Sequence, residues 1–246
     1  MGLDRIPANW PLREFSEFVL CGETVWHTQR IGAGPVVLLL HGTGASTHSM
    51  ADLATLLSRR FTCVLIDLPG QGFTPALRER KYLLSAMSSA VADLCDQLDL
   101  VPDYVIGHSA GAAVGIRMSL DTPIAPKGIL SINGALLPFG AFIEPMMIKA
   151  ARGLSQSSRV VHFLARRGTG EAYVRRALRD TGAAISEPMI KRYAQLISQP
   201  EHIEGTLRMM GGWELRKLAA DLAHVNTPVH LIGSAKDHIV PATRAH

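Results

Sequence analysis

The fold of this chain is decided by one stretch, Asp103-Tyr104-Val105-Ile106-Gly107-His108-Ser109-Ala110-Gly111. Its first half is short and apolar and predicts a buried strand, and residues 112–120 after it are small and apolar at helical spacing. Strand, Gly-x-Ser-x-Gly and helix form the context of a nucleophile elbow, in which a serine stands on a sharp, strained turn. We therefore predict Ser109 as a nucleophile beside a helix N-terminus, which favours developing negative charge. The pentapeptide alone leaves open an incidental serine in a glycine-rich turn.

Composition sets the broad class of the protein. The 246 residues are 47% hydrophobic and 19% charged, which is typical of one globular α/β domain. No apolar run approaches the roughly 20 residues that cross a bilayer, so we expect no transmembrane segment. The three cysteines are scattered and odd in number, which favours reduced thiols in a cytoplasmic protein. No cysteine–histidine spacing indicates a metal site, and we expect no cofactor.

Charge is distributed unevenly along the chain. Residues 1–134 hold 10 Lys/Arg and 12 Asp/Glu, whereas residues 135–227 hold 13 Lys/Arg and 8 Asp/Glu. The basic excess of the later segment is typical of a solvated helical surface, with a binding patch as the alternative. Neither an aromatic–basic platform nor a nucleic-acid motif accompanies it, so we exclude nucleic acid as a partner.

The rest of the chain alternates between apolar runs that predict strands and longer segments at helical spacing. A glycine turn joins the first two predicted strands into a hairpin. Strands are predicted at 18–21, 24–30, 35–40, 61–66, 103–106, 127–132 and 227–232, with helices at 49–60 and 83–100. This alternation predicts an α/β fold with a mostly parallel sheet and right-handed crossovers.

The segment after the sixth predicted strand contains no convincing strand. It reads as helices near 143–154, 159–165, 170–181, 188–198 and 202–210. It is too long for a crossover, so we predict a helical cap inserted over one end of the sheet. The predicted domains are a core of 1–134 and 227–246 and a cap of 135–226.

Two further segments supply chemistry to Ser109. The sequence His41-Gly42-Thr43-Gly44 follows a buried strand, so the backbone N–H groups of Thr43 and Ala110 can stabilise an oxyanion. Asp237 follows the seventh predicted strand in a Gly-x-x-x-Asp-x-x-Val-Pro setting, which favours an orienting acid over a surface turn aspartate.

These motifs resemble the α/β-hydrolase family over nearly the whole chain, and the order serine then aspartate fits that family. Segments 41–49, 107–113 and 133–140 look most similar to the magnesium-chelatase accessory proteins of bacteriochlorophyll synthesis. The resemblance implies an α/β-hydrolase fold, a serine nucleophile and a place near the magnesium insertion step. It supplies a pathway and leaves the reaction open.

The base histidine of the family follows an eighth strand, and this sequence stops nine positions after Asp237. We expect either a fragment of a longer protein, with the last strand missing, or a protein without a conventional triad. His246 would have to reach Ser109 from a helix, and His238 is adjacent to the acid, so both are poor candidates for the base. His41 and His108 are expected to support the oxyanion loop and the elbow, and His230 to pack in the core.

The predicted cap contains large apolar side chains and many arginines. They are Leu136, Leu137, Phe139, Phe142, Met146, Met147, Leu154, Phe163, Met209, Met210 and Trp213, with Arg152, Arg159, Arg166, Arg167, Arg175, Arg176 and Arg179. Some of the apolar residues are expected to line a pocket above Ser109, which would suit a flat apolar ligand with carboxylates, such as a tetrapyrrole.

Three functions are consistent with the sequence. The favoured one is a serine hydrolase of an ester or related acyl bond in bacteriochlorophyll synthesis. The second is a non-catalytic accessory that binds a tetrapyrrole or magnesium chelatase. The third is a generic esterase or C–C bond hydrolase unrelated to pigment.

Overall fold

The computed structural model describes residues 2–77, 82–138, 140, 143–168, 170–182, 185–237 and 239–240. Seven strands form one sheet with the order β1-β2-β4-β3-β5-β6-β7. Their bounds are β1 Ser16–Cys21, β2 Thr24–Ile31, β3 Val36–Leu40, β4 Thr62–Ile66, β5 Tyr104–His108, β6 Gly128–Ile132 and β7 Val229–Ile232. β2 runs antiparallel to β1 and β4, and the other pairs are parallel. The predicted mostly parallel sheet is confirmed.

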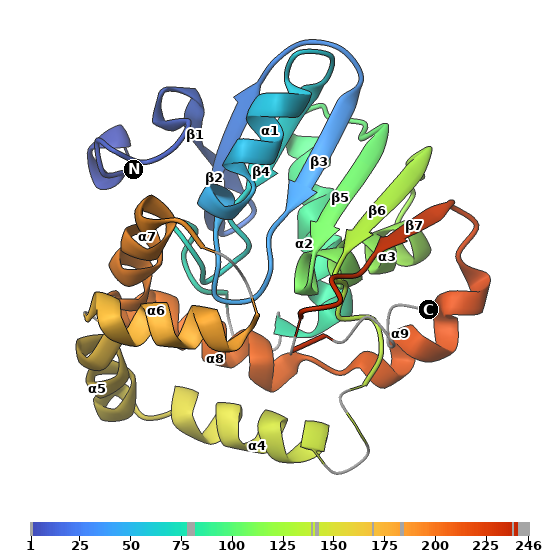
Figure 1. The fold of residues 1–246 in the computed structure, drawn as a ribbon. Helices are drawn as coiled ribbons and strands as arrows, with labels where there is room; N and C mark the ends of the chain where they lie inside the picture. The colour runs from blue at the N-terminus through green and yellow to red at the C-terminus, as the bar shows by residue number, and fades with distance from the viewer. Residues whose placement is uncertain are drawn as a thin grey trace.

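Alternation along the central strands creates a core on each face of the sheet (Figure 1). Leu38 and Leu40 of β3 point into a cluster with α2 (Leu84–Gln97) and α3 (Ala110–Asp121). Their neighbours Val37 and Leu39 pack on the other face with α1 (Ala51–Leu57). Because successive side chains of a strand point to opposite faces, one continuous apolar run fills both cores.

Six helices lie below the carboxyl ends of the parallel strands (Figure 1). These cap helices are α4 Ile143–Ser155, α5 Ser158–Gly168, α6 Glu171–Asp180, α7 Glu187–Ile197, α8 Pro200–Gly212 and α9 Leu215–Asp221. The five helices predicted here are present, whereas α9 was missed because its seven residues span only about two turns. The division into a core of 1–134 and 227–246 and a cap of 135–226 stays a prediction.

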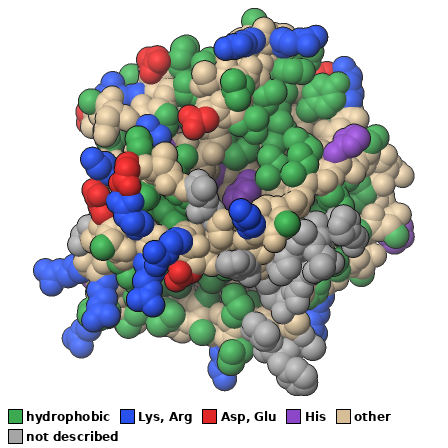
Figure 2. All heavy atoms as spheres, viewed as in Figure 1, with side chains coloured by type: hydrophobic (Ala, Val, Ile, Leu, Met, Phe, Trp, Pro, Cys, Tyr) green, Lys and Arg blue, Asp and Glu red, His purple; other side chains and the backbone are tan. Residues whose placement is uncertain are grey.

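The β7 end of the sheet is the least covered part of the core. Leu231 and Ile232 are 45% and 51% exposed. Hydrophobic side chains also gather next to them, over the face of β3, β5 and β6 (Figure 2). His230 is also exposed, so the expectation that it packs in the core is wrong. Within the described residues no strand pairs with the outer edge of β7.

Two features are absent from the part of the chain that the structure describes. None of its helices is long and apolar enough to cross a membrane, and no group of three metal-binding side chains occurs in it. The three cysteines, Cys21, Cys63 and Cys95, are free. Burial raises the pKa of the Cys63 thiol to about 11, which keeps it protonated.

Candidate active site

Ser109 joins β5 to α3 in a strained conformation. Its backbone has φ 51° and ψ −116°, a region that side chains other than glycine rarely adopt. A Cβ on Gly107 would lie 2.3 Å from the nitrogen of Ala112, and a Cβ on Gly111 would lie 2.2 Å from the oxygen of Leu40. Both glycines are therefore required by the turn, and the serine side chain remains partly exposed.

The loop after β3 lies directly against this turn. A Cβ on Gly42 would lie 3.1 Å from the Cβ of Ser109. His41 holds the loop, because its Nδ1 lies 2.8 Å from the oxygen of Gly42 and its Nε2 accepts from the nitrogen of Leu68 at 2.9 Å. Burial lowers the pKa of His41, although Asp67 opposes the shift, so the ring is neutral with its proton on Nδ1. His41 therefore supports the loop after β3, as expected, while the oxyanion role of that loop stays a prediction.

Gln71 is a polar contact of this loop that the sequence reasoning missed. Its side chain is fully buried, and its Oε1 accepts from the nitrogen of Gly44 at 2.5 Å. Its Nε2 lies 2.8 Å from Sδ of Met209 on α8. Only the turn-rich composition of residues 67–72 pointed to this segment.

The predicted oxyanion donors, Thr43 and Ala110, differ from Gly44, whose backbone N–H already donates to Gln71. The Thr43 backbone N–H has no acceptor among the loop hydrogen bonds of the described residues. Ala110 is the first residue of α3, and an N–H at that position has no partner within its own helix. Both groups are therefore available to a ligand beside Ser109.

The carboxylate of Asp237, on the loop after β7, accepts hydrogen bonds from three groups among the described residues. Its Oδ1 accepts from the nitrogens of Ile239 and Val240, each at 2.8 Å. Its Oδ2 accepts from Nδ2 of Asn133 at 2.5 Å, and Oδ1 of Asn133 accepts from the nitrogen of Ser234 at 2.7 Å. Asn133 follows β6, whose last residue, Ile132, accepts the Ser109 N–H at 3.0 Å. Asn133 thus connects the acid loop to the elbow, a role that the sequence reasoning missed.

No described histidine completes a triad. None of them forms a hydrogen bond with Ser109 or Asp237 among the bonds of the described residues, and His238 and His246 lie outside those residues. His108 is half-buried beside Ser109. Burial lowers its pKa, and the negative charge of Asp237 opposes that shift.

A buried carboxylate fixes the loops behind the site. Asp67 Oδ2 lies 2.7 Å from Nδ1 of His27 and accepts from the nitrogen of Phe73 at 2.8 Å, while Oδ1 accepts from the nitrogen of Thr47 at 2.6 Å. Burial alone would raise the pKa of Asp67, but His27, His41 and the Phe73 N–H together lower it to about 2. The carboxylate is therefore ionised and structural.

Helix α8 is anchored to the same loops. His202 Nδ1 accepts from the nitrogen of Gly72 at 3.1 Å, and its Nε2 lies 3.2 Å from the oxygen of Gly44. A Cβ on Gly205 would lie 2.0 Å from the oxygen of Gly70, so the two backbones touch. Burial lowers the pKa of His202 to about 4. The cap is thus fixed at α8 to the oxyanion loop.

The apolar cap residues separate into two groups. Met209 is buried at the loop, and Leu136 and Trp213 belong to the main core. Four others are exposed, which does not fit the expected pocket lining: Met146, Met147, Leu154 and Phe163. Phe139 and Phe142 lie outside the described residues.

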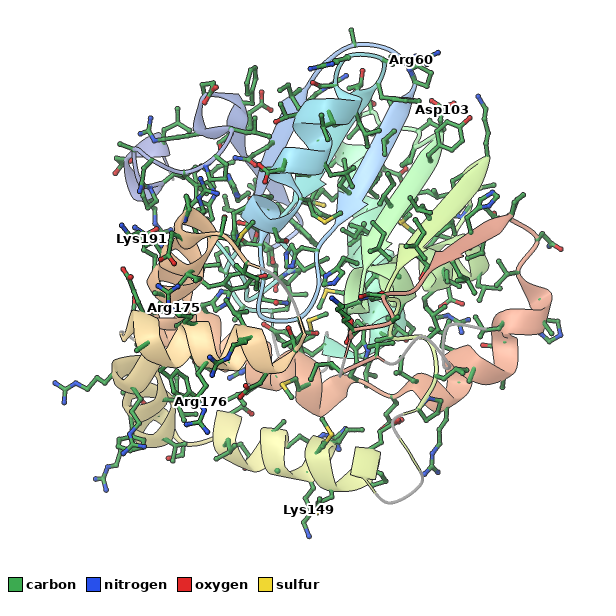
Figure 3. All side chains as sticks on the ribbon, in the orientation of Figure 1. Arg60, Asp103, Lys149, Arg175, Arg176 and Lys191 are labelled. Atoms are coloured by element: carbon green, nitrogen blue, oxygen red, sulfur yellow. The ribbon has the colours of Figure 1, made fainter. Side chains whose placement is uncertain are left out.

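The cap arginines are exposed as well. Arg175 pairs with Glu187, and Arg152 Nε donates to the oxygen of Gly211 at 2.5 Å. Figure 3 shows Arg175 and Arg176 on α6 at the side of the molecule.

The order of the strands and the strained turn at Ser109 are typical of one class of protein, which the comparisons also indicate. Residues 37–246 match the alpha/beta hydrolase family, and the chain belongs to that family. It is 38% identical over 242 residues to the magnesium-chelatase 30 kDa subunit of Rhodobacter capsulatus, covering 96% of this chain and 84% of that protein. The resemblance drawn from the sequence motifs is thereby confirmed.

Solved structures share the fold at lower identity. A hydrolase from Pseudomonas aeruginosa PA01 has a TM-score of 0.71 and 19% identity, over 94% of this chain and 84% of that chain. An α/β hydrolase fold protein from Burkholderia ambifaria has a TM-score of 0.70 and 19% identity, over 93% and 86%. These similarities show the fold alone.

Proposed function

We propose that this chain is a serine hydrolase that cleaves an ester or a related acyl bond. One observation carries the proposal: Ser109 is strained at φ 51°, and its Cβ would touch a Cβ placed on Gly42 of the oxyanion loop. Backbone strain of this kind persists where the surrounding structure enforces it, and it clusters at functional sites. In the proposed site the hydroxyl works with two backbone N–H donors, those of Thr43 and Ala110.

The proposed reaction uses the serine as a covalent nucleophile. Ser109 Oγ attacks the acyl carbon while its proton passes to a base, and the carbonyl oxygen becomes an oxyanion held by Thr43 and Ala110 N–H groups. Collapse expels the protonated alcohol and leaves an acyl-serine, which water hydrolyses by the same steps. Two such donors contribute several kcal/mol to the transition state.

The base of the proposed reaction is an imidazole oriented by Asp237. Among the described residues the carboxylate Oδ2 accepts one hydrogen bond, from Asn133, and a carboxylate oxygen has a second lone pair for a ring N–H. We infer that this lone pair orients the base, which is absent from the described residues.

The pathway is proposed from similarity. A relative at 38% identity over nearly the whole chain is named as a subunit of magnesium chelatase. We place this chain at the magnesium insertion step of bacteriochlorophyll synthesis, with magnesium chelatase as its partner.

A second candidate is a non-catalytic accessory that binds a tetrapyrrole or magnesium chelatase. Two observations favour it: the relative is named as a chelatase subunit, and no described histidine bonds to Ser109 or Asp237. A generic esterase or C–C bond hydrolase unrelated to pigment fits the fold equally, but no side chain of the site favours it.

A fluorophosphonate probe tests the hydrolase proposal, because it labels a serine only when the hydroxyl is activated. We expect labelling of the full-length protein, loss in its Ser109→Ala variant, and full labelling in the control Ser119→Ala, ten residues along α3. If the wild-type protein is not labelled, the proposal that it is a serine hydrolase is refuted. Titration with a porphyrin and co-purification with magnesium chelatase then test the accessory role, since a spectral shift or a stable complex with unlabelled protein would support it.

A further inference from the structure

The outer side of α5 combines arginines with an exposed aromatic ring. Arg159, Phe163 and Arg167 recur every four residues on one side of the helix and are exposed, with Phe163 at 55%. The opposite side, with Val161 and Ala165, is buried. The Arg167 guanidinium carbon lies 5.1 Å from the centroid of the Phe163 ring. The helix contains no acidic residue.

Helix α4 continues this surface. Met146 and Lys149 are three residues apart on one side of the helix and are both exposed, Met146 at 67%. Met147, 39% exposed, borders the buried side. Glu144 and Ala151 on the other side of the helix are buried. Figure 3 shows Lys149 pointing away from the rest of the molecule, on the side of the cap opposite the sheet. We call the following residues the α4–α5 surface: Met146, Lys149, Arg159, Phe163 and Arg167.

The charge of this part of the cap is strongly positive. Residues 143–180 contain eight Lys/Arg and three Asp/Glu, and blue side chains gather at the lower left of Figure 2, over these helices. Among the ion pairs of the described residues, none involves Lys149, Arg159 or Arg167. These three cations are therefore free to meet an anionic partner.

We propose that the α4–α5 surface binds an anionic lipid bilayer. Basic residues next to a membrane attract anionic headgroups, and aromatic and apolar side chains on the same face enter the boundary between headgroups and acyl chains. Met146 and Phe163 are 67% and 55% exposed on outer sides of their helices, beside cations without an ion-pair partner among the described residues. Excess positive charge next to exposed apolar side chains matches the anionic headgroups and the acyl boundary of a bilayer. A phosphodiester backbone would satisfy the arginines and leave Met146 and Phe163 in water.

The binding leaves the candidate site intact. Helix α8, which is anchored to the oxyanion loop, lies between α4 and the sheet (Figure 1). The α4–α5 surface thus holds the cap toward the bilayer and the sheet away from it. This inference is independent of catalysis at Ser109.

Co-sedimentation with lipid vesicles tests the proposal. We expect binding to equimolar phosphatidylglycerol and phosphatidylcholine, little binding to phosphatidylcholine alone, and release at high salt. The double variant Arg159→Glu with Arg167→Glu changes the net charge by four units, and at about fivefold per charge its partitioning should fall about 600-fold. The control Arg60→Glu with Val101→Ser changes exposed residues at the far end of the sheet, where Arg60 lies in Figure 3, and should bind normally.

Insertion of the ring is tested separately. The chain's three tryptophans are buried, so Phe163→Trp adds a single exposed indole. We expect brominated anionic vesicles to quench its emission. The proposal is overturned by a wild-type protein that does not bind anionic vesicles at low salt, by a control variant that loses binding equally, or by an indole that stays unquenched in the bound protein.

Discussion

Gly205→Ala is expected to destabilise the protein because α8 touches the loop of Gly70 through backbone atoms. The added Cβ would lie 2.0 Å from the Gly70 oxygen, and real Cβ contacts are essentially never shorter than 3.0 Å. The helix must therefore move by roughly 1 Å relative to the loop. That movement also breaks the contacts of His202 with Gly72 and Gly44, which are already 3.1 and 3.2 Å long.

The expected magnitude follows from these contacts. Overpacking costs about 1–3 kcal/mol, and each lost hydrogen bond about 1 kcal/mol. Alanine offsets about 1 kcal/mol of this through its helix propensity. The free energy of unfolding should fall by about 2–4 kcal/mol, and the melting temperature by roughly 5–15 °C for a domain of this size.

Urea unfolding of Gly205→Ala beside Gly153→Ala measures the effect. Gly153 lies in α4, and nothing stands within 4 Å of an added Cβ. The same substitution there should raise stability by about 0.5–1 kcal/mol. If Gly205→Ala proves as stable as Gly153→Ala, the backbone contact between α8 and the loop is refuted.

Three further substitutions test the buried groups. The pKa of His202 is lowered from 6.5 to about 4. As the pH falls, the His202 side chain is therefore protonated in the unfolded chain before it is protonated in the folded protein. Stability should fall by about 3 kcal/mol as pH drops from 6.5 to 4, and urea unfolding of His202→Gln should show a flatter profile. Asp67 has a pKa lowered from 3.8 to about 2. Its contribution of about 2 kcal/mol is present above pH 4 and lost as pH falls toward 2, so the deficit of Asp67→Asn at pH 7 should shrink in acid unfolding curves. Asn133→Gly allows the backbone φ of 43° and removes the side-chain amide that donates to Asp237. Fluorophosphonate labelling of Ser109 should slow about tenfold. An unchanged labelling rate would show that Asn133 does not contribute to the site.

Several features of the site were readable in the sequence for local reasons. The elbow depends on glycines within two residues of Ser109, because the clash of a Cβ on Gly107 or Gly111 comes from atoms close in the chain or from the adjoining strand. The helix of Ala110 begins at the next residue, so its position relative to Ser109 is also local.

Other contacts bring together residues that no local pattern relates. Asn133 and Asp237 are 104 positions apart, and Gln71 and Met209 are 138 apart. An asparagine after one strand and a glutamine in a turn have many possible partners, so their roles follow only once parallel strands end at the same edge of the sheet.

The sequence by itself determined the strands and the tight turn at Ser109, because periodicity and steric demand act between neighbours along the chain. Only the tertiary structure decided which side chains of the cap are buried against the core and which are exposed to solvent. Met209 and Met146 are the same residue type in similar helices, yet one is buried at the oxyanion loop and the other is 67% exposed. Their difference depends on which side of each helix packs against the core, and that is fixed by contacts between distant segments.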